Sequence, residues 1–319
     1  MRTNLRERLF SRSRVAEGED PFDARLFTSI DRMRLRIHRA SGARSGETLV
    51  RGLTQDSGIE VESFKTYTPG DDIRYVDWNA AARIDQLLTR RFVAEREIPV
   101  HLLLDASASM AAPSGDPKFF FARKLVAALA YIALNNNDPV RVTALGSGAE
   151  GAQLTSSPLL RHRGRYLSLK PMLGALRAEG PTLLVPGVVQ YVERHRERGI
   201  AALVSDFLVP ESAYEEALSR LASRKLEVLA IQVVGRGDRD LSSVDGRLRL
   251  RDVETGAIRE VVLDAAQRRR YENAFARRVE VIRAFCHSRG IAHALADAQD
   301  GVEHCLTKIL SRSGMLKLR

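Results

Sequence analysis

The chain has 319 residues, of which 44% are hydrophobic, and this allows one large domain or two ordinary ones with full cores. The formal net charge of +10 raises the hypothesis of a nucleic-acid-binding protein, but aromatic residues make up 6% of the chain, so few side chains could stack on bases. No DNA- or RNA-binding motif accompanies the charge. We therefore expect a basic surface that suits an acidic partner, and no nucleic-acid partner.

The sequence predicts no membrane span. The longest apolar run, Leu125 to Leu134, is about half of what a membrane-spanning helix requires. The first residues alternate Arg with polar side chains and lack the apolar core of a signal peptide. These features predict a cytoplasmic location.

Cys286 and Cys305 are the two cysteines of the chain, which is too few for a disulfide framework or a paired-thiol zinc pattern. We expect both thiols to be reduced. A zinc site is the alternative, because His287, His293 and His304 lie nearby in the sequence. Ordinary packing is the favoured interpretation, since adjacent residues such as Cys286 and His287 point to different sides of a helix.

In chain order, residues 1–22 are rich in Arg, Ser and Glu and predict a flexible basic arm. From Phe22 the apolar positions recur at three- and four-residue steps, which predicts a helix that ends near Ser41. We group this helix with the following segment as one region, residues 23–98. The helical positions are Leu26, Ile30, Met33 and Ile37.

Within this region, the runs Val61 to Tyr67 and Leu87 to Val93 predict strands of a small β-rich subdomain, and the Thr68 to Asp72 segment between them predicts a turn. The segment at 70–83 reads GDDIRYVDWNAAAR. Its Trp78 could contact a ligand, but a turn capped by carboxylates and anchored by the indole is the favoured interpretation.

Residues 99–312 alternate strands and helices, as a parallel α/β sheet requires. The prediction is a doubly wound, mostly parallel sheet of Rossmann-like type, with a β-hairpin insertion at about 247–263. We expect strands at 99–104, 140–145, 201–204, 226–234 and 291–295, and helices at 118–134, 165–178, 186–198, 211–223, 265–287 and 302–311.

A polar motif, Asp105-Ala106-Ser107-Ala108-Ser109, follows the first of these strands. Ligands of open α/β sheets bind outside the carboxyl ends of the strands, so these side chains fall where a site is expected. One carboxylate and two hydroxyls at alternate positions can converge on a hard cation. Two more oxygen donors follow later elements, Thr182 before the Pro186 helix and Asp206 after the strand at 201–204.

The order of strand-DxSxS, threonine loop and strand-Asp resembles the von Willebrand factor A domain, whose metal-ion-dependent adhesion site is assembled from those three loops. The resemblance covers roughly residues 99–310. Upstream, GDDIRYVDWNAAAR followed by Arg90-Arg91-Phe92 and then LLLDASASM is similar to the bacterial domain-of-unknown-function 58 family. Members of that family are commonly linked with MoxR-type AAA ATPases, so the resemblance implies an adaptor or co-chaperone that works with such an ATPase in protein or complex maturation.

The resemblance also implies roles for single residues. Ser107, Ser109 and Thr182 would bind the metal directly, Asp105 and Asp206 would hold it through water, and an acidic side chain of a protein partner would complete the shell. The expected cofactor is one Mg²⁺ ion, with Mn²⁺ or Ca²⁺ as alternatives, because hydroxyls, waters and few carboxylates suit a hard cation. The threonine loop departs from the family pattern, since it reads Gly180-Pro181-Thr182 where a second glycine is frequent.

Three other interpretations remain open. The aspartates could cap strand ends and the serines the following helix, without any metal. Ser107 could be the nucleophile of a hydrolase with His162 or His195 as its base, although it lacks the G-x-S-x-G elbow and we expect no enzymatic activity. The basic surface could bind nucleic acid, a contact that would weaken steeply with added salt.

Overall fold

The computed structural model describes residues 26, 28, 30–31, 33–35, 61–84, 86–92, 97–113, 117–148, 151–224, 226–241, 246–310 and 316–318. The chain forms two compact units, a small one made of Gly42–Glu97 and a large one made of Met1–Ser41 and Ile98–Arg319. The arm predicted at residues 1–22 lies outside the described residues. No described helix has the length and apolar character needed to cross a membrane.

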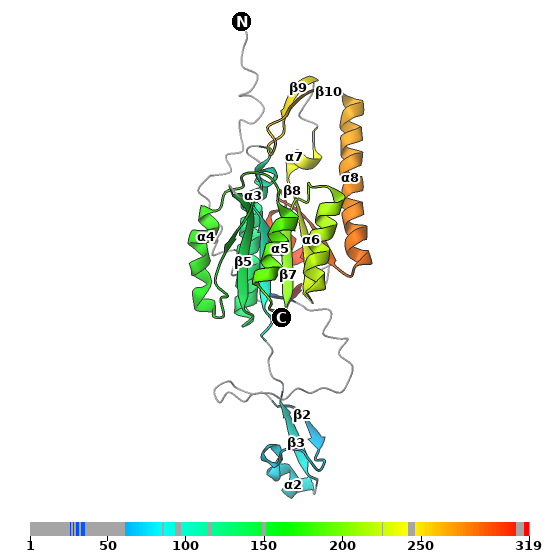
Figure 1. Ribbon diagram of the computed structural model, residues 1–319. Helices are drawn as coiled ribbons and strands as arrows, with labels where there is room; N and C mark the ends of the chain where they lie inside the picture. Colours follow the sequence, from blue (N-terminus) through cyan, green and yellow to red (C-terminus); the bar gives the residue numbers. More distant parts are fainter. Residues whose placement is uncertain are drawn as a thin grey trace. The chain divides into compact units, whose positions relative to one another are not determined.

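The large unit is built on a six-stranded sheet with the order β11-β8-β7-β4-β5-β6. Figure 1 labels its strands β5, β7 and β8 together with the helices around them. All pairs are parallel except β5 with the edge strand β6. Counted along the chain, the strand order is 3-2-1-4-5-6, so the predicted doubly wound, mostly parallel sheet is confirmed. The strands are β4 (Val100–Asp105), β5 (Val140–Gly148), β6 (Gly151–Ser156), β7 (Ile200–Ser205), β8 (Glu227–Val234) and β11 (Ala292–Asp297).

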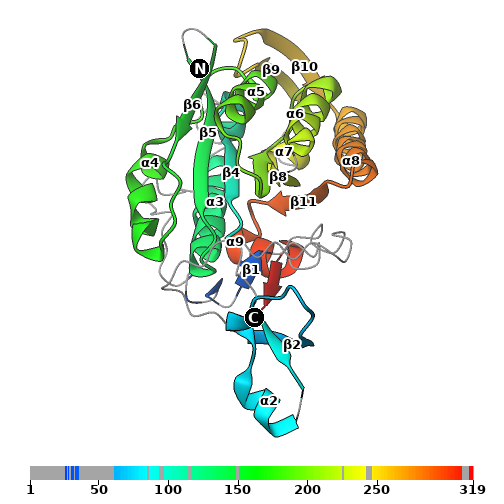
Figure 2. The same cartoon turned by 60° about the horizontal axis from the view of Figure 1, so that its bottom comes forward.

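Helices pack on both faces of this sheet, and each face has its own buried apolar cluster. One cluster joins the sheet to α3 (Lys118–Asn135), α4 (Leu169–Ala175), α9 (Gly301–His304) and the π-helical turn η5 (Cys305–Leu310). The other joins it to α5 (Leu184–Arg194), α6 (Glu211–Ser223) and the C-terminal part of α8 (Ala265–Ser288). Figure 2 shows α3 behind the strands and α5, α6 and α8 gathered on one side.

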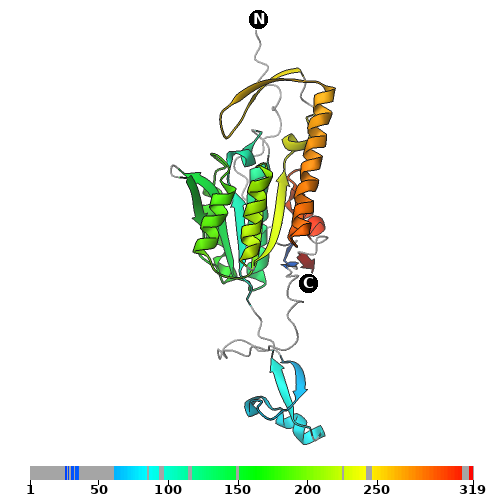
Figure 3. The same cartoon turned by 45° about the vertical axis from the view of Figure 1, so that its right-hand side comes forward.

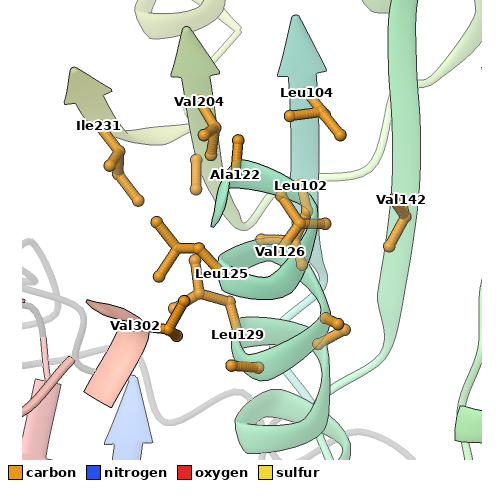
Figure 4. Packing of buried hydrophobic residues seen from close by; sticks show 14 of the residues in the cluster. Leu102, Leu104, Ala122, Leu125, Val126, Leu129, Val142, Val204, Ile231 and Val302 are labelled. Carbon is orange, nitrogen blue, oxygen red and sulfur yellow. The ribbon is translucent and has the colours of Figure 1, made fainter. Parts of the chain in front are cut away.

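Helix α3 is apolar around most of its circumference, a pattern typical of a buried helix. Its residues Leu125 and Leu129 lie in the same buried cluster as Leu104 of β4 and Val204 of β7, on the face of the sheet that α3 covers (Figure 4). Burial of all four side chains is essentially complete. This layer fixes the position of the β4 and β7 ends relative to the start of α3.

The predicted helix at 165–178 is divided in two, a 3-10 helix η4 (Arg163–Ser168) followed by α4. Pro171 lies in the first turn of α4 and has no backbone N–H to continue a hydrogen-bond ladder from η4. The helix predicted at 302–311 is α-helical at Gly301–His304 and π-helical at Cys305–Leu310. The other predicted helices and strands of the large unit are present with end shifts of a few residues.

Between β8 and α8 the chain leaves the sheet. The short helix α7 (Arg236–Arg239) is followed by β9 (Gly246–Arg251) and β10 (Ile258–Leu263), which pair only with each other among the described strands. The predicted hairpin insertion is therefore present. Figures 1 and 3 both show it at the same end of the molecule as the N-terminal half of α8, and we call β9, β10 and α8 the hairpin arm.

The helix expected from Phe22 to Ser41 is wrong at Met33–Leu35, which form a strand. Residues 26, 28 and 30 are helical, but β1 (Met33–Leu35) pairs antiparallel with β12 (Leu316–Leu318). Leu26, Ile30 and Met33 are buried in the same cluster as α3. This segment consequently belongs to the large unit, and its grouping with residues 42–98 is corrected, because burial against α3 outweighs proximity in sequence.

The small unit contains the predicted strands as β2 (Val61–Thr66) and β3 (Leu88–Phe92), joined through η2 (Ile73–Tyr75) and α2 (Trp78–Ile84). Carboxylates cap its turns as expected, since Asp77 Oδ1 accepts hydrogen bonds from the backbone of Asn79 and Ala80. The indole does not anchor the turn, because Trp78 is 61% exposed at the first position of α2.

We expect Leu129→Ala to lower the free energy of unfolding of the large unit by about 2–5 kcal/mol, because the deletion opens a cavity between α3 and the sheet. Leu167→Ala is the matched control, since this leucine is 65% exposed and should cost less than about 1 kcal/mol. Urea unfolding followed by far-UV circular dichroism measures both. Equal effects of the two substitutions would contradict this description of the core.

Candidate functional site

Two aspartates stand at the C-terminal ends of the neighbouring strands β4 and β7. Asp105 is the last residue of β4, and Asp206 follows β7 directly. After β4 the chain builds one half of the sheet, and β7 begins the other half, so these strands flank the point where the strand order reverses. Both aspartates are 2% exposed. The topology therefore brings together two carboxylates that the sequence separates widely.

Asp105 organises the loop that follows it. Its Oδ1 accepts a hydrogen bond of 3.0 Å from the backbone N–H of Ser107, and its Oδ2 accepts one of 2.6 Å from the Ser205 hydroxyl. The hydroxyl oxygens of Ser107 and Ser109 lie 3.1 Å apart. Since all these side chains are buried, the predicted hydroxyl pair is held in a fixed arrangement beside the carboxylate.

A buried lysine, Lys118, enters the site from the first turn of α3. Its ammonium donates to Asp206 Oδ2 at 3.0 Å and to both oxygens of Asp238, at 3.1 and 3.2 Å. Asp238 also accepts a hydrogen bond of 2.8 Å from the backbone of Gly235, just after β8. We call Asp105, Asp206, Asp238 and Lys118 the acidic cluster.

The acidic cluster has three carboxylates facing one ammonium, so two negative charges are in excess when all are ionised. Burial, together with the charge of Asp206, raises the pKa of Asp105 to about 6. Burial also raises the pKa of Asp238, although Lys118 opposes this shift. Burial alone would lower the pKa of Lys118, but the charges of Asp206 and Asp238 raise it. Among the described residues, no cationic group lies within ion-pair distance of Asp105.

Thr182 lies in a loop that is hydrogen-bonded to the serine loop, since the backbone N–H of Ala108 donates to Gly180 O at 2.9 Å. Gly180 has a φ of +73°, and a Cβ there would lie 1.9 Å from the Ser147 hydroxyl oxygen. The glycine is thus required by both conformation and space. It brings the threonine loop alongside Ala106 and Ala108.

The side chain of Thr182 is engaged by the hairpin arm. Its hydroxyl donates to Oε1 of Glu254, and its backbone N–H donates to Oε2 of the same carboxylate at 3.1 Å. Glu254 lies in the turn between β9 and β10. The carboxylate at Thr182 therefore comes from this chain itself.

Of the five residues proposed from sequence, the structure brings Asp105, Ser107, Ser109 and Asp206 into one buried site, and it joins the loop of Thr182 to them through the backbone. Sequence reasoning missed four contributors. The position of Asp238 after a strand end was a usable signal, and so was the position of Ser205 beside Asp206. Nothing in the local sequence marked Lys118 or Glu254 as part of the site. The four missed residues are Lys118, Ser205, Asp238 and Glu254.

The side chains considered for other chemistry lie elsewhere. Nδ1 of His195 is 2.6 Å from the Arg141 guanidinium, and His162 precedes η4, so neither histidine is described in contact with Ser107. Cys286 and Cys305 are buried in the two different apolar clusters, one on each face of the sheet. Burial raises the pKa of each thiol to about 12. The two cysteines therefore do not share a metal site.

The fold and the site together define a doubly wound α/β domain of the von Willebrand factor A type, with paired hydroxyls and carboxylates at the reversal of strand order. The family model described as "Protein of unknown function DUF58" matches residues 63–281, more than half of the chain. The chain belongs to this family. The sequence-based family assignment is confirmed.

An uncharacterized protein of Mycobacterium tuberculosis is 32% identical to this chain over 262 residues, which cover 80% of this chain and 79% of that protein. An aerotolerance-related membrane protein from Bacteroides fragilis matches at a TM-score of 0.36 and 18% identity, over 56% of this chain and 88% of that one. A von Willebrand factor type A structure from Catenulispora acidiphila matches at a TM-score of 0.34 and 17% identity, over 60% of this chain and 44% of that one. These structural likenesses concern the fold alone.

We expect Lys118→Met to lower the free energy of unfolding by about 3–5 kcal/mol, because it leaves Asp206 and Asp238 buried without their cation. Adding Asp238→Asn should restore part of this loss. Urea unfolding measures the difference. As a control, Arg220→Met removes an exposed pair with Glu216 and should cost less than about 1 kcal/mol. A Lys118 variant as stable as the control would refute the proposed role of the ammonium.

In metal-free protein, we expect Asp105→Asn to raise the free energy of unfolding at pH 7.5 by roughly 1–3 kcal/mol. The pKa of Asp105 is about 6 when folded and near 3.8 when unfolded. Between pH 3.8 and about 6, Asp105 is therefore protonated in the folded state and ionised in the unfolded state. The free energy of unfolding falls as pH rises through that range. The asparagine cannot ionise, so the variant should not lose stability over this pH range. Chemical unfolding in chelator from pH 4 to 8 measures it.

The matched control for Asp105→Asn is Asp252→Asn, at the exposed turn of the hairpin. Hydrogen bonds from the backbone of Thr255 and Glu254 lower the pKa of Asp252. Its ionised form therefore favours the folded state, and the amide should be slightly less stable at pH 7.5. If Asp105→Asn were also destabilising at this pH, the excess negative charge would not be the dominant feature of the site.

Proposed function

We propose that this chain is a metal-dependent protein-binding adaptor without enzymatic activity of its own. A divalent cation, Mg²⁺ in the first place and Mn²⁺ or Ca²⁺ otherwise, would bind at Ser107, Ser109 and Thr182, with Asp105 and Asp206 holding it through water. An acidic side chain of a protein partner would complete the shell. The observation that carries the proposal is the burial of three carboxylates with one ammonium beside a fixed pair of hydroxyls.

The donor set suits a hard divalent ion. Ligands about 2.1 Å from Mg²⁺ on neighbouring corners of an octahedron are about 3 Å apart, and the two serine oxygens are separated by 3.1 Å. Asp105 and Asp206 each accept fewer than four described hydrogen bonds, and a carboxylate has about four acceptor positions, so both retain capacity for a metal-bound water. Hydroxyl and carboxylate oxygens favour magnesium, manganese or calcium over zinc.

Charge supports the same proposal. Two excess carboxylates in a buried site are costly, and a divalent cation would neutralise them. Lys118 already neutralises part of the acidic cluster, but its ammonium bonds Asp206 and Asp238 and has no described contact with Asp105. The ion would therefore bring to Asp105 the positive charge that Lys118 gives to the other two carboxylates.

The proposed partner is a MoxR-type AAA ATPase that presents an acidic residue, and the process is protein or complex maturation. The basic charge of +10 supports an acidic protein partner. On the hairpin, Arg247, Arg249 and Arg251 alternate along β9 and so share one face. All three are exposed, and they would favour approach of an acidic surface beside the site.

Binding is favoured over hydrolysis because the Ser107 hydroxyl lies 3.1 Å from the Ser109 hydroxyl, and neither His162 nor His195 is described in contact with it. Nucleic-acid binding is the second alternative, and it rests on net charge. Salt and chelator distinguish the two kinds of contact: phosphate binding falls steeply with ionic strength, whereas a metal-bridged protein contact is abolished by chelator.

We expect calorimetric titration of Mn²⁺ or Mg²⁺ into the full chain to show one saturable site, with affinity at least about tenfold weaker in Ser107→Ala because a direct ligand is lost. Ser223→Ala is the control, since this exposed hydroxyl donates to Arg220 O far from the site. Binding of a purified MoxR-type ATPase should then require metal and be lost in Ser107→Ala. No saturable metal binding at millimolar concentration would refute metal dependence.

A further inference from the structure

The hairpin arm places a carboxylate on the threonine of the candidate metal site. Glu254 binds Thr182 with both oxygens, one at the hydroxyl and the other at the backbone N–H, across 72 positions of sequence. This two-point contact is the way in which a serine or threonine at a loop recognises an acidic side chain. Thr182 is thus a carboxylate-binding point, already filled from within the chain.

The turn that carries Glu254 is well defined. Asp252 Oδ1 accepts hydrogen bonds from the backbone N–H groups of Glu254 and Thr255, at 2.9 and 2.8 Å, and Asp252 N–H donates to Ala257 O. Gly256 has a φ of +73°, which closes the turn. The hairpin therefore presents Glu254 from a structured tip, and ordering the tip adds little cost to the contact with Thr182.

The rest of the hairpin arm is fastened to the other site loops. The Tyr271 hydroxyl donates to the backbone oxygen of Asp238 at 2.7 Å. The Arg278 guanidinium donates to the backbone oxygens of Phe207 and Val209, in the loop after Asp206. Glu254, Tyr271 and Arg278 thus connect the hairpin arm to the loop between α4 and α5 and to the loops that follow β8 and β7.

We infer that Glu254 is a built-in competitor, which occupies the position that the acidic side chain of a partner takes and closes the site in the free protein. This inference rests on the proposed function and deepens it. A partner carboxylate can bind at Thr182 only after Glu254 has left it. The apparent affinity for the partner is therefore reduced in proportion to the fraction of molecules in which Glu254 still occupies Thr182. The exposed hairpin, free of the main sheet, is the element that moves.

The test uses the full chain and a fluorescent peptide with the sequence of residues 251–258, RDVETGAI, as the acidic probe. Fluorescence anisotropy in millimolar Mg²⁺ should show at least about tenfold tighter peptide binding to Glu254→Gln than to the wild-type chain. The peptide with glutamine in place of its glutamate should bind neither. Adding Thr182→Val to Glu254→Gln should remove the gain.

Glu260→Gln is the matched control, because it makes the same change in charge on β10 and no described contact of Glu260 reaches Thr182. It should bind the peptide as weakly as the wild-type chain. Equal peptide binding by wild type, Glu254→Gln and Glu260→Gln, or none by Glu254→Gln, would overturn the inference. Chelator tests the proposed function separately: peptide binding to Glu254→Gln that survives chelator argues against metal dependence and leaves the competition intact.

A distance measurement checks closure without any ligand. Nitroxide labels at Val253→Cys and Ser212→Cys report the separation of the hairpin tip from α6, and the native cysteines are buried and will not compete for the label. Pulsed electron spin resonance should give a narrow distribution in otherwise wild-type protein and in Glu260→Gln. Glu254→Gln and Thr182→Val should broaden it, and an unchanged distribution in both would overturn the inference.

Discussion

Two carboxylates are buried side by side at the ends of β4 and β7, and the surrounding loops offset the repulsion between them. Burying one charge without a partner is costly, and burying two of the same sign is costlier. Asp105 receives hydrogen bonds from Ser107 and Ser205, while Asp206 receives the Lys118 ammonium. Each of these contacts constrains a different loop or helix, so the geometry of the site follows from neutralising this pair.

The compensation is incomplete, which supports the proposed metal binding. Hydrogen bonds and one lysine leave the acidic cluster with more negative than positive charge. The loop after Asp206 also holds Phe207 at a φ of +53°, a conformation that is strained for a buried aromatic residue. Strain and excess charge at one place are what a binding site tolerates and a purely structural strand end avoids.

Much of the fold could be predicted because it depends on patterns along the chain. Apolar runs that end at polar residues marked β4 and β7, and helical periodicity marked α6 and α8 almost to the residue. One failure was a case in which a tertiary partner decided. Helical spacing of apolar residues extended past Asp31, but β12 from the other end of the chain turned the segment Met33–Leu35 into a strand. Trp78 was expected to anchor its turn, yet it is exposed, since carboxylate caps suffice there.

The sequence by itself determined that Asp105, Ser107, Ser109 and Asp206 would meet. Each follows a predicted strand, and the C-terminal ends of parallel strands share one edge of a sheet. Only the tertiary structure decided which residues neutralise the carboxylates of the site and which segment covers it. Lys118 reaches Asp238 across 120 positions of sequence and Glu254 reaches Thr182 across 72, distances over which no local pattern selects a partner. Those pairings depend on how α3 and the hairpin arm pack onto the finished sheet.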